Sequence, residues 1–254
     1  MGLEINKKNF FFSLTIIVLF LINFNNLFAK EISKLTNIWD IKLGMFYSDI
    51  PTQDFMFFAC GTNGGPPSKI LKNKFHDYNL CKPDENNLRE VYFEYDDEAY
   101  YWALAFNDTF SSNFQGTRVF SHPSVLSLLF DEDGIVKGVR IVTDDRASHE
   151  ERKSSAGFFF KLEKTFGDDP WDCVDFDPDE GETPIGASFL KRMCIKEDFD
   201  KKIILQGTYF RKKGQKTFDP VSNKPTTGYF ESSVKLDVFS KDINVDYSKY
   251  GWHK

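Results

Sequence analysis

The densest group of potential metal ligands is GDDPWDCVDFDPDEGETP, residues 167–184, where eight carboxylates gather. Within it Asp175, Asp177 and Asp179 alternate as in a calcium-binding loop, which needs oxygen ligands that converge on a hard cation. Counted from the first of these aspartates, position six is Glu180, where an EF-hand loop needs glycine. The pattern therefore predicts a solvated acidic loop, with an irregular calcium site at the three aspartates as the alternative.

Four aromatic side chains surround a short acidic segment, residues 96–98. They are Tyr92, Tyr95, Tyr101 and Trp102. Aromatic faces beside carboxylates can grip sugars or anchor a protein partner. Strand alternation predicts that about half of these side chains point inward. We take the four residues as the candidate binding surface.

The glycine-rich stretch GTNGGPPSK, residues 61–69, invites comparison with phosphate-binding loops. Such loops need Lys-Ser or Lys-Thr at the start of a helix, whereas here the order is Ser68-Lys69 and two prolines remove amide donors. We interpret it as a structural loop. The chain also lacks the G-x-S-x-G elbow of serine hydrolases, and no catalytic residue or cofactor is assigned.

The four cysteines fall into two equally spaced pairs, which favours disulfides between Cys60 and Cys81 and between Cys173 and Cys194. In an oxidising compartment an even cysteine count is first interpreted as disulfides, and four cysteines allow three connectivities. A zinc site has no support, because there is no C-x-x-C and the four histidines are scattered.

The amino terminus has the layout of a secretory signal peptide. Lys7 and Lys8 precede an apolar run, residues 10–24, and Ala29 follows as a small residue at the expected cleavage point. The alternative is an uncleaved membrane anchor, but the run is shorter than the roughly 20 residues that span a bilayer. We therefore expect residues 1–29 to be removed and the mature protein to be periplasmic or secreted, without an integral membrane segment.

The chain is acidic, with a formal net charge of -6 at pH 7. A protein that neutralises phosphates needs a concentrated basic face, so nucleic acid is not an expected partner.

Two hairpins are predicted in the first half of the chain. REVYFEY, residues 89–95, and YYWALAF, residues 100–106, flank the acidic segment and suggest one of them. VLSLLF, residues 125–130, and IVKGVRIV, residues 135–142, flank the turn at Asp133-Gly134 and predict the other. In the second hairpin the residues expected to share the inner face are Leu126, Leu128, Phe130, Ile135, Val139 and Ile141.

A helix and more strands follow. Ser148 and Glu151 form a capping box, and apolar residues then recur at helical spacing up to Phe166 before Gly167 ends the helix. In residues 228–240 apolar and polar positions alternate, with Lys235 and Asp237 among the polar ones, which predicts that one face of the sheet is exposed to solvent. Few helices beside several antiparallel strands make an α+β fold class.

The equal spacing extends beyond the cysteines. The strand-like runs VYFEY, residues 91–95, and ILQGTYF, residues 204–210, are related by the same offset of about 113 residues as the cysteines. An internal duplication explains this economically. We therefore expect two related α+β modules, residues 30–145 and 146–254, each with one disulfide.

The segments LGMFYSDIP and LEKTFGDDPW, with the loop and strands between them, resemble the tandem α+β modules of beta-lactamase inhibitory protein and of small SmpA/BamE-type outer-membrane lipoproteins. Gly44-Met45 matches the start of the short helix in those modules, and Phe166-Gly167 with Pro170 matches the helix end. Pro51 and the lack of a lipid-bearing cysteine depart from the pattern. The resemblance implies protein binding on a concave sheet face and carries over no particular residue.

These observations favour an exported, non-catalytic module that binds a protein or a cell-envelope component. The alternative is a carbohydrate-binding or carbohydrate-active protein that uses the aromatic–acidic segment.

Overall fold

The computed structural model describes residues 37–108, 116–212, 217–218, 225–226 and 230–250. The predicted signal peptide and its cleavage point lie outside these ranges. Within the described ranges, no helix is both long and apolar enough to cross a membrane.

The described chain is mostly antiparallel sheet with few helices, which confirms the α+β class at this level. The helical segments are η1 (Ile38–Asp40), η2 (Tyr47–Asp49), η3 (Lys74–Leu80), α2 (Glu98–Ala105), α4 (His149–Arg152), α5 (Ser155–Thr165) and η4 (Tyr247–Tyr250). The strands are β1 (Phe55–Cys60), β2 (Arg89–Tyr95), β3 (Arg118–Val119), β4 (His122–Phe130), β5 (Val136–Thr143), β6 (Asp172–Asp175), β7 (Glu182–Thr183), β8 (Leu190–Glu197), β9 (Lys201–Lys212), β10 (Thr217–Phe218), β11 (Pro225–Thr226) and β12 (Glu231–Ser240).

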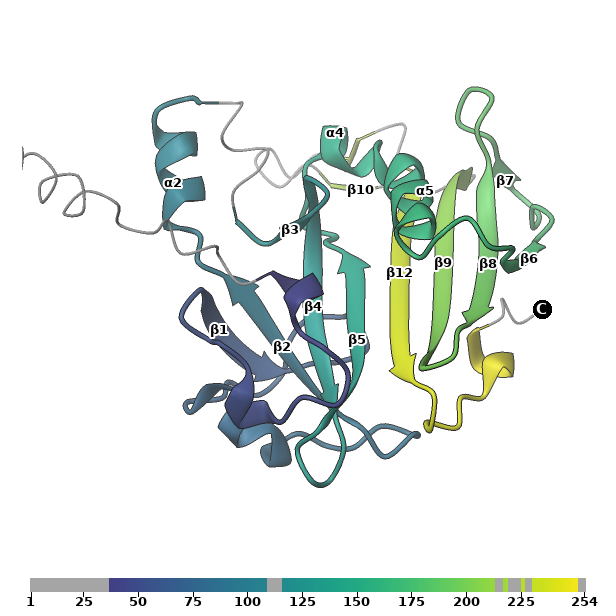
Figure 1. Cartoon of the computed structure of the whole chain (residues 1–254). Coiled ribbons are helices and arrows are strands. Elements are labelled where there is room, and N and C mark those ends of the chain that lie inside the picture. Colours follow the sequence, from purple (N-terminus) through teal and green to yellow (C-terminus); the bar gives the residue numbers. More distant parts are fainter. Residues whose placement is uncertain (1–36, 109–115, 213–216, 219–224, 227–229, 251–254) are drawn as a thin grey trace, which may run out of the picture. The chain divides into compact units, whose positions relative to one another are not determined.

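Eight strands form one continuous path in the order β1-β2-β4-β5-β12-β9-β8-β6 (Figure 1). The neighbouring strands on this path are antiparallel. The short strands β3 and β7 extend the sheet beside β4 and β9, and β10 pairs with β11 in a separate ribbon. The strands from early and late in the chain meet where β5 pairs with β12, at the middle of the path.

The hairpin around Asp133-Gly134 is confirmed as β4 and β5. Its inner face differs from the prediction at one position, because the register shifts between Leu129 and Phe130. This irregularity places Val136 opposite Phe130 and in the core, while Ile135 pairs with Phe46 outside the strand. An extra residue in one strand of an antiparallel pair has this effect, since it moves the next side chain to the other face.

The other predicted hairpin is wrong. Its first arm is β2, but β2 pairs with β1 and β4, and the segment expected as the second arm forms α2. Three alanines and a leucine within residues 98–105 favour a helix, and none of these eight residues is β-branched. The Asp96 carboxylate also accepts a hydrogen bond from the backbone N–H of Glu98, at 2.9 Å, at the start of the helix.

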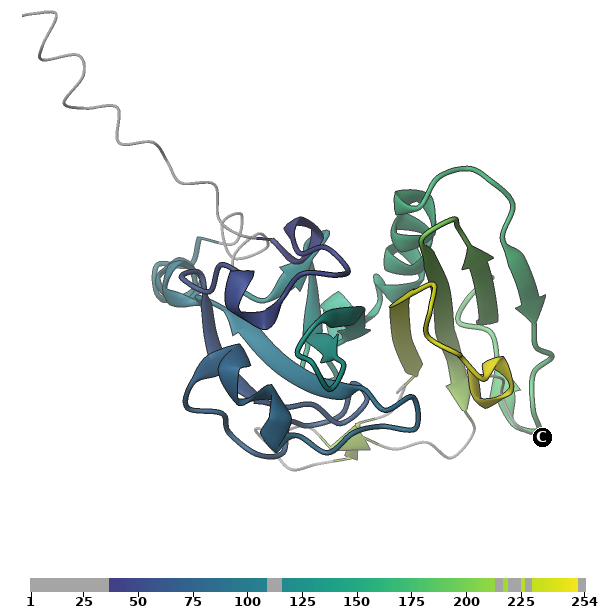
Figure 2. The same ribbon diagram turned by 60° about the horizontal axis from the view of Figure 1, so that its bottom comes forward.

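The capping box at Ser148 and Glu151 is confirmed, and it opens α4 rather than one continuous helix. The helix that follows, α5, buries Phe158, Phe159 and Leu162 against the sheet and is followed by Gly167 with φ +90°. It lies against β12 and β9, as the two views in Figure 1 and Figure 2 show. A Cβ on Gly207 of β9 would stand 2.5 Å from a ring carbon of Phe159, so this glycine allows the close approach of α5.

Both faces of the sheet are covered, which corrects the prediction of one wet face. The larger core includes Leu128, Leu205 and Leu236 together with the buried side of α5. Side chains that alternate with these point to the opposite face and form a second core with the carboxyl-terminal segment. That second core comprises Leu88, Leu129, Met193, Ile204, Phe239, Val245 and Tyr250. Asp237, expected in solvent, is completely buried because the carboxyl-terminal segment lies over this face.

The two predicted disulfides are confirmed. Cys60 is bonded to Cys81 and Cys173 to Cys194, each across 21 positions of sequence, and the described chain contains no free cysteine. The two bridges differ in setting: the first joins the end of β1 to the residue after η3, whereas the second joins facing residues of β6 and β8. The offset that relates the cysteines also relates β2 to β9. These strands do not hold equivalent places, since β2 is second from one sheet edge and β9 third from the other.

Candidate functional site

The helix α2 carries a set of exposed large apolar side chains. The exposed fractions are 63% for Tyr101, 50% for Trp102, 51% for Leu104 and 75% for Phe106, which directly follows the helix. We call these four residues the α2 aromatic surface. Of the eight helical residues only Ala103 is buried, and Figure 1 shows α2 standing beyond the end of β2. Most helices of globular proteins bury an apolar face against the fold, so this exposure requires an explanation.

The aromatic rings of this surface are ordered against one another. Trp102 and Phe106, four positions apart and therefore on one side of the helix, stack with ring centroids 5.9 Å apart and an interplanar angle of 20°. Tyr101 meets Trp102 edge to face at 5.5 Å. These contacts hold the rings together without burying them.

Acidic residues flank the aromatic surface on both sides along the chain. Asp96, Asp97 and Glu98 precede it and Asp108 follows it, while no lysine or arginine occurs in residues 96–108. All four carboxylate residues are exposed. The surface is therefore apolar at its centre and negatively charged at its rim.

The four aromatic residues predicted as a binding surface do not lie together. Tyr92 is 2% exposed and donates a hydrogen bond to the Glu94 carboxylate, and burial raises its pKa. Tyr95 packs against the larger core and its hydroxyl accepts a hydrogen bond of 2.8 Å from the backbone N–H of Ile38. Burial raises the pKa of Tyr95 to about 12. Only Tyr101 and Trp102 remain available to a partner.

Leu104 and Phe106 were missed by sequence reasoning because the segment was interpreted as a strand. The signal that would have found them is the alanine spacing, which marks a helix and places Trp102 and Phe106 on one side of it.

The aspartates proposed as calcium ligands lie in exposed positions, and two of them pair with basic side chains. Asp175 accepts hydrogen bonds of 2.6 and 2.8 Å from the Arg192 guanidinium, which lowers the pKa of this carboxyl. Asp179 accepts a hydrogen bond of 2.7 Å from the Lys191 ammonium. The calcium site stays a prediction, and these two cations would compete with a metal ion for the carboxylates.

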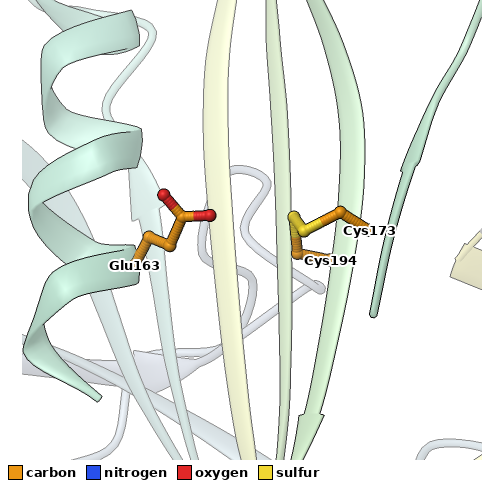
Figure 3. Close-up of side chains that lie close together, drawn as sticks. All are labelled: Glu163, Cys173 and Cys194. Carbon is orange, nitrogen blue, oxygen red and sulfur yellow. A yellow bond between two sulfur atoms is a disulfide. The ribbon is translucent and has the colours of Figure 1, made fainter. Parts of the chain in front are cut away.

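A different group of potential metal ligands lies between α5 and the sheet. Glu163 points toward Cys173 and Cys194 in Figure 3, with the ligand atoms of the three residues within 4.8 Å of one another. The two sulfur atoms form a disulfide and therefore offer no thiolate, which is the form of cysteine that binds metals. We assign no metal to this group.

A polar cavity lies on the sheet face opposite α5. Its volume is about 590 Å³. It is lined by Gly61, Thr62, Asn63, Lys82, Asp84, Glu85, Asn86, Leu88, Glu90, Arg140, Gln206, Lys235, Lys249 and Tyr250. The first disulfide loop, the segment between it and β2, the four strands β2, β5, β9 and β12, and the carboxyl-terminal segment thus contribute to one site. We refer to it as the polar cavity.

A buried ion network forms the floor of the polar cavity. The Arg140 guanidinium donates to Asp237 Oδ1 at 2.6 Å and to Glu90 Oε2 at 2.6 Å. Burial alone would lower the pKa of Arg140, but the two carboxylates raise it. Burial alone would raise the pKa of Asp237, but Arg140 and Lys235 lower it. Arg140 and Asp237 are therefore both ionised.

Lys235 completes this network. Its ammonium donates to Asn63 Oδ1 at 2.5 Å and lies 3.4 Å from Asp237 Oδ2, while burial lowers its pKa. With Arg140, Lys235, Glu90 and Asp237 the network balances two cations against two anions. The sequence signals for it are Arg140 in β5 and Lys235 with Asp237 in β12. In β12 the alternation of apolar and polar residues predicts a solvent-facing side, whereas these charges pair with one another.

Comparison of the chain with protein-family models, with curated proteins and with solved structures finds no match. The resemblance to the tandem α+β modules stays a prediction.

Proposed function

We propose that this chain is an exported, non-catalytic binding protein that docks a protein partner through the α2 aromatic surface. One observation carries the proposal: four large apolar side chains on and directly after an eight-residue helix are each at least half exposed. Trp and Tyr dominate the energetics of protein interfaces because they bury a large area and lose little conformational entropy.

The charge around the surface favours a protein partner over a lipid surface. Cell-envelope membranes that contain anionic lipids attract basic segments, whereas the rim of this surface carries Asp96, Asp97, Glu98 and Asp108. We expect a partner with an apolar groove for the helix and basic residues at the rim of that groove.

The same proposal includes a two-module origin of the sheet. Its support is the strand order, in which β1, β2, β4 and β5 run from one edge to the centre and β6, β8, β9 and β12 run from the other edge. Each set is preceded by short helical segments, η1 and η2 in one case and α4 and α5 in the other. In this proposal the related pairs are β2 with β8 and β4 with β9, which replaces the pairing suggested by the spacing of residues.

Export to the periplasm or the exterior is part of the proposal too. The two disulfides support it, because disulfides persist in oxidising compartments, and the signal-like amino terminus agrees with them.

The test compares two variants of the full mature chain in affinity capture from envelope extract. A double Trp102→Ala, Phe106→Ala variant removes the centre of the α2 aromatic surface. The matched control is Phe199→Ala, which removes a fully exposed aromatic side chain from the turn between β8 and β9. We expect the double variant to capture at least about tenfold less of the partner than the native chain does, which corresponds to about 1.4 kcal/mol of binding free energy. The control variant should capture as much as the native chain.

Two further measurements separate the competing functions. The first is co-sedimentation with vesicles of anionic phospholipid. Binding to these vesicles that is lost in Trp102→Ala would contradict the proposal. Titration of tryptophan fluorescence with cell-wall sugars tests the carbohydrate alternative. Of the four aromatic residues predicted for that function, Tyr92 and Tyr95 pack in the fold, which leaves Tyr101 and Trp102. A saturable response that Trp102→Ala abolishes would favour that alternative.

A further inference from the structure

The polar cavity contains one buried acceptor without a partner. Glu90 is 8% exposed, and its Oε2 atom accepts hydrogen bonds from Arg140 Nη1 at 2.6 Å and from the backbone N–H of Asn63 at 2.7 Å. Its Oε1 atom is buried and has no hydrogen-bond partner among the described residues. A buried carboxylate oxygen without a donor is unfavourable, so a ligand donor at this position would stabilise it.

The mouth of the cavity offers the complementary charge. Lys82 lines the cavity and is exposed, and within the described part of the chain it forms no ion pair. The neighbouring Lys249 is already paired with Glu85. Lys82 is therefore the cation at the mouth that can receive an anionic group.

The remaining lining limits the class of ligand. Apart from Leu88 and Tyr250, the side chains that line the cavity are polar or charged, which disfavours lipids and other apolar molecules. Four cationic and three anionic side chains line it, so the charges nearly balance and a ligand with a large net charge has little electrostatic advantage. The volume of about 590 Å³ lies in the range of small-molecule sites.

We propose that the polar cavity binds a small zwitterion, a free amino acid or a very short peptide, with its ammonium group at Glu90 Oε1 and its carboxylate at Lys82. Glu90 Oε1, which has no hydrogen-bond donor, and Lys82, which has no ion pair among the described residues, then receive the two charged ends of the ligand. Because the ligand has no net charge, the net charge of the cavity does not change. This site is separate from the α2 aromatic surface and does not depend on the function proposed for it.

Calorimetric titration of the full mature chain tests this assignment, with the twenty amino acids and diglycine as probes. The expected result is saturable binding of at least one probe with a Kd of about 1 mM or tighter. The N-acetylated form and the carboxamide of the same probe should each bind at least about tenfold more weakly, because each lacks one of the two charges.

Variants of the protein provide the second arm. Lys82→Met removes the charge and keeps a long side chain. It should weaken binding of the zwitterion at least about tenfold and leave binding of its carboxamide unchanged. Lys72→Met makes the same change at an exposed lysine outside the cavity and should have no effect. Glu90→Gln should make the protein insensitive to N-acetylation of the ligand. Since Glu90 contacts Arg140 and its replacement can unfold the protein, the Lys82→Met result decides where Glu90→Gln does not fold.

Three outcomes would overturn the assignment: no saturable binding of any zwitterionic probe, equal binding to Lys82→Met and the native chain, or preferential binding of neutral saccharides. A response that persists in Lys82→Met but disappears in Trp102→Ala would place the ligand at the α2 aromatic surface instead.

Discussion

Arg140 and Asp237 face each other across β5 and β12, where Nε of the arginine lies 2.6 Å from Oδ1 of the aspartate and both side chains are buried. This ion pair joins the two strands at the middle of the sheet path, one from each half of the chain. Breaking a buried pair is expensive because the remaining charge stays out of water without compensation.

The first prediction concerns this pair. Asp237→Ala should lower the free energy of unfolding by about 3–5 kcal/mol, since it leaves Arg140 buried beside Glu90 alone. Asp242→Ala removes an exposed partner of Lys137 and should change it by about 1 kcal/mol or less. Urea denaturation of both variants measures the difference. A loss below 1 kcal/mol for Asp237→Ala would show that the network relaxes or admits water.

The second prediction gives the pH dependence of the same pair. Burial alone would raise the pKa of Asp237, but Arg140 and Lys235 hold it below its unfolded value. A lowered carboxyl pKa contributes stability that is fully present above the unfolded pKa and lost as the pH falls through the folded pKa. The gap in unfolding free energy between the native chain and Asp237→Asn should therefore be largest above about pH 5 and shrink below about pH 4. A gap that is constant or grows with acid would contradict the ionised state of Asp237.

The third prediction separates exposed from buried aromatic residues. Trp102→Ala and Phe106→Ala should each change the free energy of unfolding by about 0.5 kcal/mol or less, because neither side chain is packed in the fold. Phe93→Ala, at a fully buried position of β2, should lower it by about 3–5 kcal/mol. Thermal and chemical denaturation measure both. A large destabilisation by Trp102→Ala would mean that α2 packs against another part of the chain and is not free to bind a partner.

The fourth prediction concerns the disulfides. Loop-closure entropy gives each bridge a stabilisation of about 3 kcal/mol, and the two should be equal in this respect because both span 21 positions. Replacing Cys60 and Cys81 by alanine should be the more destabilising change, since both are buried in the larger core. The free energies of unfolding of the two double-alanine variants test this order. A larger loss on replacing Cys173 and Cys194 would contradict the prediction.

Local chemistry in the sequence predicted several elements correctly. The Asp133-Gly134 turn, the capping box at Ser148 and both cysteine pairs were recognised because each depends on residues close in sequence or on regular spacing. The segment at residues 100–106 was misread because aromatic residues favour strands, while the alanines between them favour a helix.

Sequence patterns could not predict the polar cavity. Whether Asp237 faces water or a covered ion network depends on where residues 241–250 fold back over the sheet, and strand alternation carries no information on that. Asn63, Arg140 and Lys235 are likewise brought together by contacts between segments far apart in the chain.

Site-specific photocrosslinking tests the central proposal most directly. A photoreactive phenylalanine analogue placed at position 102 in cells that make the protein should give one protein adduct of defined mass. The same analogue at position 199, which is equally open to solvent, should not give that adduct. Adducts at 102 with lipid alone, with glycan alone, or with the same proteins as at 199 would contradict a protein-docking role for the α2 aromatic surface.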